Sequence, residues 1–154
     1  MEQFNEIEKV IEKYLANEEE PFSNCFLGGV SEEIICKVES RLEVLFPESY
    51  KLFLKKFGSG GIGGMMFWGI EDKKESIERY TVVAITEEYR KKGLPHNLIV
   101  FEENGDYISC LETDKMNTNN ECPVVTWSVY DEDGIVFLEE DFSSYFLSRV
   151  EEYV

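Results

Sequence analysis

Residues 50–68 read YKLFLKKFGSGGIGGMMFW, and the spacing of the apolar side chains changes inside this stretch at Gly58. Before Gly58, the residues Phe53, Leu54 and Phe57 recur at the spacing of one helix face. After it, apolar residues come in short runs bounded by turn residues, which is typical of strands. Gly58 itself is typical of the position just past a helix end. The stretch therefore divides the chain into a helical part and a strand-forming part.

Two more helices are predicted before Gly58. Apolar residues within residues 4–15 repeat at helical spacing, which indicates an amphipathic helix. A second helix is expected after Ser31, a good N-cap residue followed by acidic residues that suit the helix dipole. Its apolar face is expected to reach Leu45. Pro47 is expected to end it and can also occupy the first position of the next helix.

Two segments lie between the glycines and the clearest strands. Met65–Ile70 is apolar and aromatic, which predicts a strand. Residues 80–92 read as a short helix ending at Gly93, although the β-branched residues near its start weaken this interpretation.

Two hairpins and a helix are predicted in the remaining sequence. Asn104-Gly105 is a strong two-residue turn signal between strands over residues 97–101 and 107–111. A second hairpin is expected to join residues 123–130 to 135–138 through an acidic turn. Asp141 is a good N-cap for a final helix.

The order of these elements predicts an α+β fold: helices, then a mainly antiparallel sheet, then a C-terminal helix. Alternating strands and helices, the α/β pattern, are not expected. No repeat or long linker interrupts residues 1–154, so we expect a single domain.

Charge is the most unusual feature of the composition. The chain has 32 acidic and 15 basic residues, a net charge of −17, and residues 93–154 hold 14 acidic and 2 basic residues. Affinity for phosphates comes from clustered Lys and Arg, so direct binding to nucleic acid or anionic membrane is disfavoured. The charge favours a cationic protein partner, or it serves only to keep the protein soluble.

The apolar runs, the first residues, the cysteines and the single histidine limit where the protein can act and which metal or thiol chemistry it can carry out. No apolar run approaches the roughly 20 residues of a membrane-spanning helix, and the first residues do not resemble a secretory signal, so we expect a cytoplasmic protein. Cysteines 25, 36, 110 and 122 form no Cys-x-x-Cys pair, and His96 is the only histidine. Reduced thiols are therefore expected, and neither a metal site nor a cofactor is expected.

Two motifs partly match known binding sites, one for dinucleotides and one for calcium, but each lacks a feature that its site requires. Gly58, Gly60 and Gly63 match a dinucleotide fingerprint, but that site needs a strand before the glycines and a helix after them. The order here is reversed, so the glycines are expected to shape the backbone. Asp131, Asp133 and Gly134 resemble part of a calcium-binding loop, but Val129 stands two residues before Asp131, where the pattern requires an acid or an amide.

No catalytic motif stands out either. There is no nucleophile elbow, and His96 lies in a predicted loop with nothing to indicate a triad. With 32 carboxylates, no acid–base pair is singled out by its spacing. The chain is therefore not expected to be an enzyme.

The candidate binding residues lie at the two acidic turns, because turns are exposed and tolerate functional variation. Tyrosine and tryptophan near them would be the aromatic anchors, since these residues are common hot spots. Trp127 has a second interpretation as a core residue. The Gly61–Trp68 region is the next candidate surface. The proposed set is Glu102, Glu103, Asp106, Trp127, Tyr130, Asp131, Glu132 and Asp133.

Residues 41–54, RLEVLFPESYKLFL, and 57–61, FGSGG, resemble the signature of the SUKH superfamily, the Smi/Knr-like group. That signature has a helix ending in Leu-Pro, an acidic or small residue, Tyr-Lys, Phe-Leu and a glycine-rich end; Phe46 replaces the usual leucine. Later segments follow the family order: LP at 94–95, NGDY at 104–107, LET at 111–113, CPVV at 122–125 and DFSSYF at 141–146.

The resemblance implies a curved sheet flanked by helices and a role in binding. Many bacterial members resemble immunity proteins that bind and block the toxin domain, often a nuclease, of a polymorphic secreted toxin. Fungal relatives look like scaffolds in cell-wall signalling. The resemblance thus implies a non-catalytic immunity (antitoxin) protein with a cationic toxin nuclease domain as its partner. A general interaction scaffold or regulator is the alternative.

Overall fold

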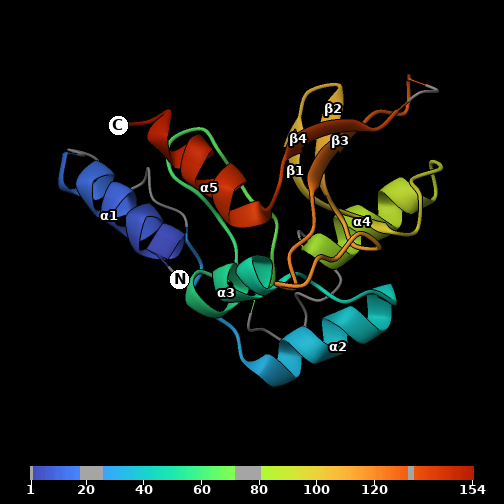
Figure 1. Ribbon diagram of the computed structural model, residues 1–154, viewed down its shortest axis with the longest axis horizontal. Helices are drawn as coiled ribbons and strands as arrows, with labels where there is room; N and C mark the ends of the chain where they lie inside the picture. Colours follow the sequence, from blue (N-terminus) through green and yellow to red (C-terminus); the bar gives the residue numbers. More distant parts are fainter. Residues whose placement is uncertain (1, 18–25, 72–80, 132–133) are drawn as a thin grey trace.

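The computed structural model describes residues 2–17, 26–71, 81–131 and 134–154. The elements are α1 (Glu2–Asn17), α2 (Glu32–Leu42), α3 (Glu48–Lys56), α4 (Val82–Arg90), β1 (Leu98–Asn104), β2 (Tyr107–Glu112), β3 (Val124–Trp127), β4 (Val136–Glu139) and α5 (Phe142–Glu151). Helices precede an antiparallel sheet and a helix follows it, so the predicted α+β class is confirmed (Figure 1). No helix within these ranges is both long and apolar enough to cross a membrane.

Polar side chains fix the starts of three helices. Ser31, Thr81 and Asp141 each accept a hydrogen bond from the backbone N–H three residues on, at the first turns of α2, α4 and α5. The first N–H groups of a helix have no partner inside the helix, so these caps define where each one begins. The caps at Ser31 and Asp141 were predicted. The cap at Thr81 starts the α4 helix despite its β-branched residues.

Helix α2 ends earlier than predicted. It stops at Leu42, because Glu43 adopts a left-handed conformation with φ of 59° and turns the chain away from the helix axis. Leu45 therefore does not belong to the helix face and is 71% exposed. Pro47 lies just before α3 as its N-cap residue and not at its first helical position.

The four strands are ordered β1-β2-β3-β4, and each pairs antiparallel with the next. The first predicted hairpin is confirmed, with Asn104 paired to Tyr107 and Gly105 in the left-handed conformation that a tight turn requires. The second is confirmed by the pairing of Thr126 with Val136, although 132–133 of its turn lie outside the described residues. This order leaves β4 at one edge of the sheet.

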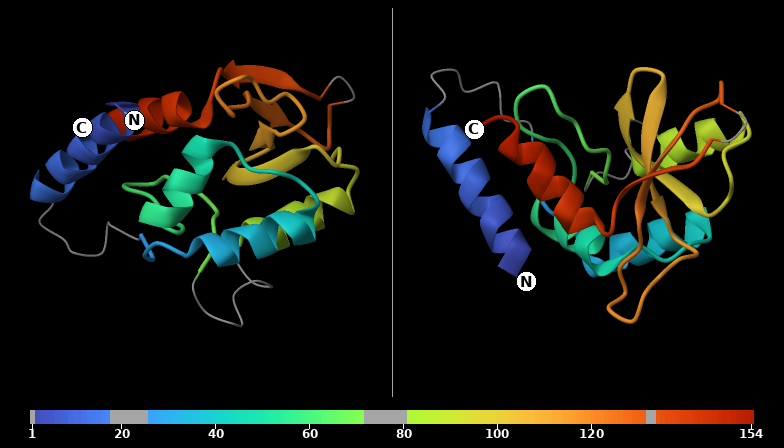
Figure 2. Two further views of the ribbon diagram at one scale, coloured as in Figure 1. Left: turned by 60° about the horizontal axis from the view of Figure 1, so that its bottom comes forward. Right: turned by 45° about the horizontal axis from the view of Figure 1, so that its top comes forward.

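The sheet is covered on both faces. One face contributes to the main core together with the buried sides of α1, α3 and α5, and α1 and α5 lie side by side in both views of Figure 2. The opposite face packs on Ile85 and Tyr89 of α4 in a smaller core. The sheet residues of the main core are Ile99, Phe101, Leu111 and Val124, and those of the smaller core are Leu98, Val100, Ile108, Cys110, Val125 and Trp127.

Met65–Ile70 was predicted to be a strand, and this prediction is wrong. Among the described residues, its one ladder contact is an isolated bridge between Phe67 and Gly60. The next residue, Trp68, donates its N–H to the carbonyl oxygen of Phe101 at 2.6 Å. The backbone of this segment therefore bonds to several different neighbours, and no regular ladder forms.

The glycines of this region allow backbone segments to pack closely. A Cβ atom on Gly69 would lie 1.8 Å from the carbonyl oxygen of Gly58, and one on Gly58 would lie 2.0 Å from that of Gly28. Gly58 also donates its N–H to Phe53 and Leu54 at the end of α3. These glycines end a helix and shape the backbone, as the order of elements predicted.

Candidate functional site

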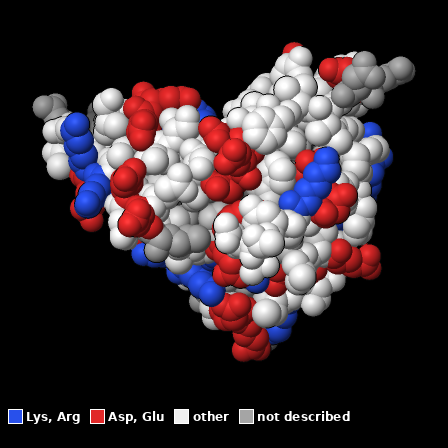
Figure 3. Space-filling model, in the orientation of Figure 1, with Lys and Arg blue, Asp and Glu red and all other residues white. Residues whose placement is uncertain are grey.

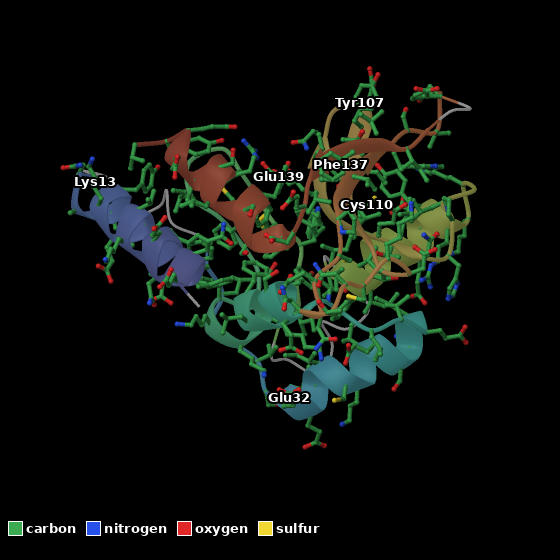
Figure 4. All side chains as sticks on the ribbon, in the orientation of Figure 1. Lys13, Glu32, Tyr107, Cys110, Phe137 and Glu139 are labelled. Carbon is green, nitrogen blue, oxygen red and sulfur yellow. The ribbon has the colours of Figure 1, made fainter. Side chains whose placement is uncertain are left out.

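The two acidic turns lie at the same end of the sheet. Ile108 of β2 pairs with Trp127 of β3, directly beside the turn of each hairpin. At the β1–β2 turn, Glu103 and Asp106 are exposed, and the exposed Tyr107 stands at the tip in Figure 4. The hydroxyl of Tyr89 donates to Glu103 at 3.0 Å, which joins this turn to α4.

Glu102 does not belong to this exposed surface, which corrects the expectation from sequence. Its side chain is 2% exposed, and Arg149 donates to its Oε2 from Nη2 at 2.9 Å and from Nε at 3.1 Å. The hydroxyl of Tyr145 donates to the same carboxylate. The reason is a bulge after Val100, which turns both Phe101 and Glu102 toward α5.

The buried carboxylate fixes the protonation of its neighbours. Burial, followed by the charge of Glu102, raises the pKa of Tyr145 to about 12. Burial opposes the charge of Arg149, but the Glu102 carboxylate outweighs it and holds the pKa of the guanidinium above its ordinary value. Tyr145 thus stays protonated and Arg149 charged at neutral pH. The arrangement fastens α5 to the sheet.

The two predicted aromatic anchors near the β3–β4 turn differ in their exposure to solvent. Tyr130 is 85% exposed. Trp127 is only 9% exposed and packs edge-on against Tyr89, with ring centroids 6.4 Å apart, so it is a core residue. Asp131 is exposed next to Tyr130, whereas the predicted residues 132 and 133 lie outside the part of the chain that is described.

A groove with a volume of about 660 Å³ lies between β4 and α5. Figure 3 shows the hollow between the helix and the sheet, with acidic side chains beside it. Figure 4 places Glu139 at this hollow, next to α5, and Phe137 on the sheet. The groove is lined by Asn104, Tyr107, Thr126, Val136, Leu138, Glu139, Tyr145, Ser148, Arg149 and Glu152.

The apolar residues along β4 are exposed, and sequence reasoning did not mark them as a site. We call Ile135, Val136, Phe137 and Leu138 the β4 strip; their side chains are between 38% and 61% exposed. A continuous apolar run is typical of a strand covered on both faces. The signal available in the sequence was that this run is short and is the last strand of a meander, which places it at a sheet edge.

Ser59 and two cysteines have structural roles. The buried Ser59 hydroxyl donates to the carbonyl oxygen of Phe67 at 3.2 Å and accepts from the N–H of Gly69 at 3.1 Å. Burial raises the pKa of the Cys122 thiol to about 12 and also raises that of Cys110. These thiols are therefore poor nucleophiles at neutral pH.

His96 is exposed, and its Nε2 lies 3.7 Å from a carboxylate oxygen of Glu43. Within the described ranges, no three or more His, Cys, Asp and Glu side chains are grouped so that they could hold a metal ion.

Together these features define an α+β protein with two turns at one end of its sheet and an apolar edge strand beside a groove. A family model described as SMI1-KNR4 cell-wall, SUKH_5, matches residues 7–151. The chain belongs to this SUKH family. It is also similar to the crystal structure of a protein from Pseudomonas syringae pv. tomato, with 22% identity, a TM-score of 0.58, and coverage of 90% of this chain and 92% of that one. At this identity the likeness concerns the fold alone.

Proposed function

We propose that this protein is a non-catalytic immunity protein that binds and blocks the toxin domain, a nuclease, of a polymorphic secreted toxin. Membership of the SUKH family supports this role, because many bacterial members resemble such proteins. We further infer one domain over residues 1–154, acting in the cytoplasm where such a toxin would do its damage.

The single observation that carries the proposal is the coincidence of acidic and aromatic side chains at one end of the sheet. Tyr107 and Tyr130 are exposed there, beside Glu103, Asp106 and Asp131. In the sequence, the two residues after Asp131 are also acidic. Exposed tyrosines can anchor a protein interface, while surrounding charges steer the partner toward it.

The electrostatics fit a nuclease in particular. A nuclease domain carries a cationic surface that holds phosphates. A protein with a net charge of −17 attracts that surface over a distance and can cover it. Blocking would then require no chemistry, only occupation of the surface that the nucleic acid uses.

Co-expression tests this role directly. A toxin domain, sought among the products of genes adjacent to the gene for this chain, is expressed in a bacterial host with and without this chain, and growth is scored. We expect the toxin domain alone to stop growth and the pair to restore it. The immunity role is wrong if co-expression does not restore growth and the purified chain does not lower the activity of the purified toxin domain.

A general interaction scaffold is the second candidate, and the β4 strip favours it. An exposed apolar patch marks a docking surface whether or not the partner is a toxin. In the co-expression experiment, a scaffold would fail to restore growth. In a separate binding assay, it would still bind a non-toxic protein partner through a defined surface.

A further inference from the structure

We propose that the β4 strip receives an extended segment of the partner, which adds to the sheet as a fifth strand and places a basic side chain in the groove beside Glu139. The identity of the partner as a cationic toxin domain rests on the proposed function. The surface and the kind of segment that it fits rest on the geometry below.

The first observation is an open sheet edge. Among the described strands, β4 pairs only with β3, so alternate backbone N–H and C=O groups of β4 point away from the sheet. Proteins usually protect such an edge with charged residues, with proline or with a covering segment. The strip from Ile135 to Leu138 has neither a charged residue nor a proline; its protection is limited to the shortness of β4 and to a register shift opposite Val124 and Val125. An edge of this kind can accept a strand from another chain.

The second observation is that the two faces of β4 present different surfaces. Val136 and Leu138 line the groove toward α5. Phe137 pairs with Val125 on the opposite face, where the smaller core lies. An added strand alternates its side chains between the two faces in the same way. It would place every second side chain in the groove and the others beside Phe137.

The third observation concerns charge. In the groove, Arg149 is held by Glu102 and Glu152, so its charge is already matched. Glu139 has no ion pair with any described residue, although it lies at the edge of this largely apolar lining. Lysine or arginine on an incoming strand would complement it.

The same charges disfavour a second copy of the chain as the occupant. Two copies joined antiparallel through β4 would set Glu139 and Glu140 of one copy toward Asp131 of the other, on molecules that both carry −17. Like charges across an interface oppose association. A basic, β-branched segment of a different protein has no such penalty, so the geometry commits to that occupant.

The test uses the full chain, labelled with ¹⁵N, and a six-residue peptide probe of sequence KVRVKV with blocked ends. Amide chemical shifts are followed during titration. We expect saturable shifts confined to β4 and to the groove side of α5. Two control peptides separate the contributions: EVEVEV reverses the charge, and KVRVKV with alternate N-methylated amides cannot donate the ladder hydrogen bonds. Each control is expected to bind about tenfold more weakly or not at all.

Variants of the chain locate the site. Leu138→Lys places a charge in the groove and is expected to reduce binding of KVRVKV by about tenfold, since it repels the basic side chain and breaks the apolar lining. Glu139→Gln should weaken binding by a few-fold, about as expected for one exposed ion pair. Its neighbour Glu140→Gln is the matched control, because Glu140 is exposed but does not line the groove, and it should bind as wild type does. Circular dichroism confirms that each variant is folded.

Three results would overturn the proposal: shifts that map elsewhere or are absent, equal binding of the N-methylated peptide, or self-association of the chain through β4. This test is independent of the immunity role. If wild type and Leu138→Lys both restore growth against the toxin domain, immunity stands and the groove proposal fails. If the peptide binds at β4 but wild type does not restore growth, the immunity role fails and the groove remains.

Discussion

Arg149 of α5 and Glu102 of β1 form a buried ion pair, with Nη2 of the guanidinium 2.9 Å from Oε2 of a carboxylate that is 2% exposed. The pair joins the last helix to the first strand across one wall of the groove. Tyr145, Ser109 and Asn104 also donate hydrogen bonds to this carboxylate. The shape of the groove therefore depends on a contact between segments that are far apart in the sequence.

We expect Arg149→Met to destabilise the protein by about 3–5 kcal/mol, because it leaves the Glu102 carboxylate buried without its partner. Equilibrium unfolding in urea measures the change. Glu152→Gln is the matched control: Glu152 also contacts Arg149, but its side chain is 56% exposed, so the loss should be about 0–1 kcal/mol. Equal effects of the two variants would show that burial of Glu102 does not govern this contact.

We expect the free energy of unfolding to depend on pH through Glu121. It accepts hydrogen bonds from Ser49 N–H at 2.9 Å and from the Ser49 hydroxyl at 2.5 Å. Burial raises its pKa above 4.5 in spite of these bonds. The folded state therefore binds this proton more tightly than the unfolded state, so the group's contribution to stability falls as pH rises from about 4.5 through the raised pKa.

The measurement compares wild type with Glu121→Gln, whose side chain does not titrate. The free energy of unfolding of wild type, minus that of the variant, should decrease as pH rises from about 4.5 and level off above the raised pKa of Glu121. A difference that increases over this range would mean that the hydrogen bonds from Ser49, and not burial, set the pKa of Glu121.

Gly69→Ala should destabilise the fold by more than about 1 kcal/mol, because its Cβ would lie 1.8 Å from the carbonyl oxygen of Gly58. Gly64→Ala is the control, since its Cβ would meet only the Tyr153 hydroxyl at an ordinary 3.6 Å, and its effect should stay within about 0.5 kcal/mol. Thermal unfolding of both variants checks this. Similar melting temperatures would show that the backbone at Gly69 can move apart at little cost.

Features set by nearby residues were predictable from the sequence. The change of period at Gly58, the Asn104-Gly105 turn and the cap at Asp141 each depend on a few adjacent residues. The burial of Glu102 was not predictable in this way. It depends on a bulge that shifts the strand by one residue and on an arginine 47 positions later.

The same distinction holds for the candidate site. The exposure of Tyr130 and the acidic turns followed from turn signals. The β4 strip did not, because an apolar run does not say whether anything covers it, and only the order of strands in the sheet leaves β4 at an edge. The early end of α2 also escaped prediction, since a left-handed glutamate is uncommon.

Neutralising the second acidic turn should slow association with the toxin domain. The triple variant Asp131→Asn, Glu132→Gln, Asp133→Asn is expected to lower the association rate and flatten its dependence on salt, because charges at the edge of an interface steer the encounter. Stopped-flow binding at several salt concentrations measures both. Stability should change little, by about 0–1 kcal/mol per charge.

A matched triple variant separates local steering from net charge. Glu2, Glu6 and Glu12 are exposed on α1, so changing all three to Gln alters the net charge by the same amount at a different surface. We expect this variant to associate nearly as fast as wild type. If the turn variant keeps the wild-type rate, the binding surface lies elsewhere; equal slowing by both variants would mean that only the total charge matters.

Tyr130→Ala should act on dissociation instead. The ring is 85% exposed in the free protein, so it contributes little to the core and its removal should leave the free energy of unfolding nearly unchanged. If the ring is buried on binding, its loss should weaken the complex by about 1–2 kcal/mol, mainly through faster dissociation. Leu45→Ala serves as the control, because Leu45 is a similarly exposed apolar residue between α2 and α3. Faster dissociation for Tyr130→Ala alone would make Tyr130 an anchor, whereas unchanged dissociation for both variants would remove this turn from the interface.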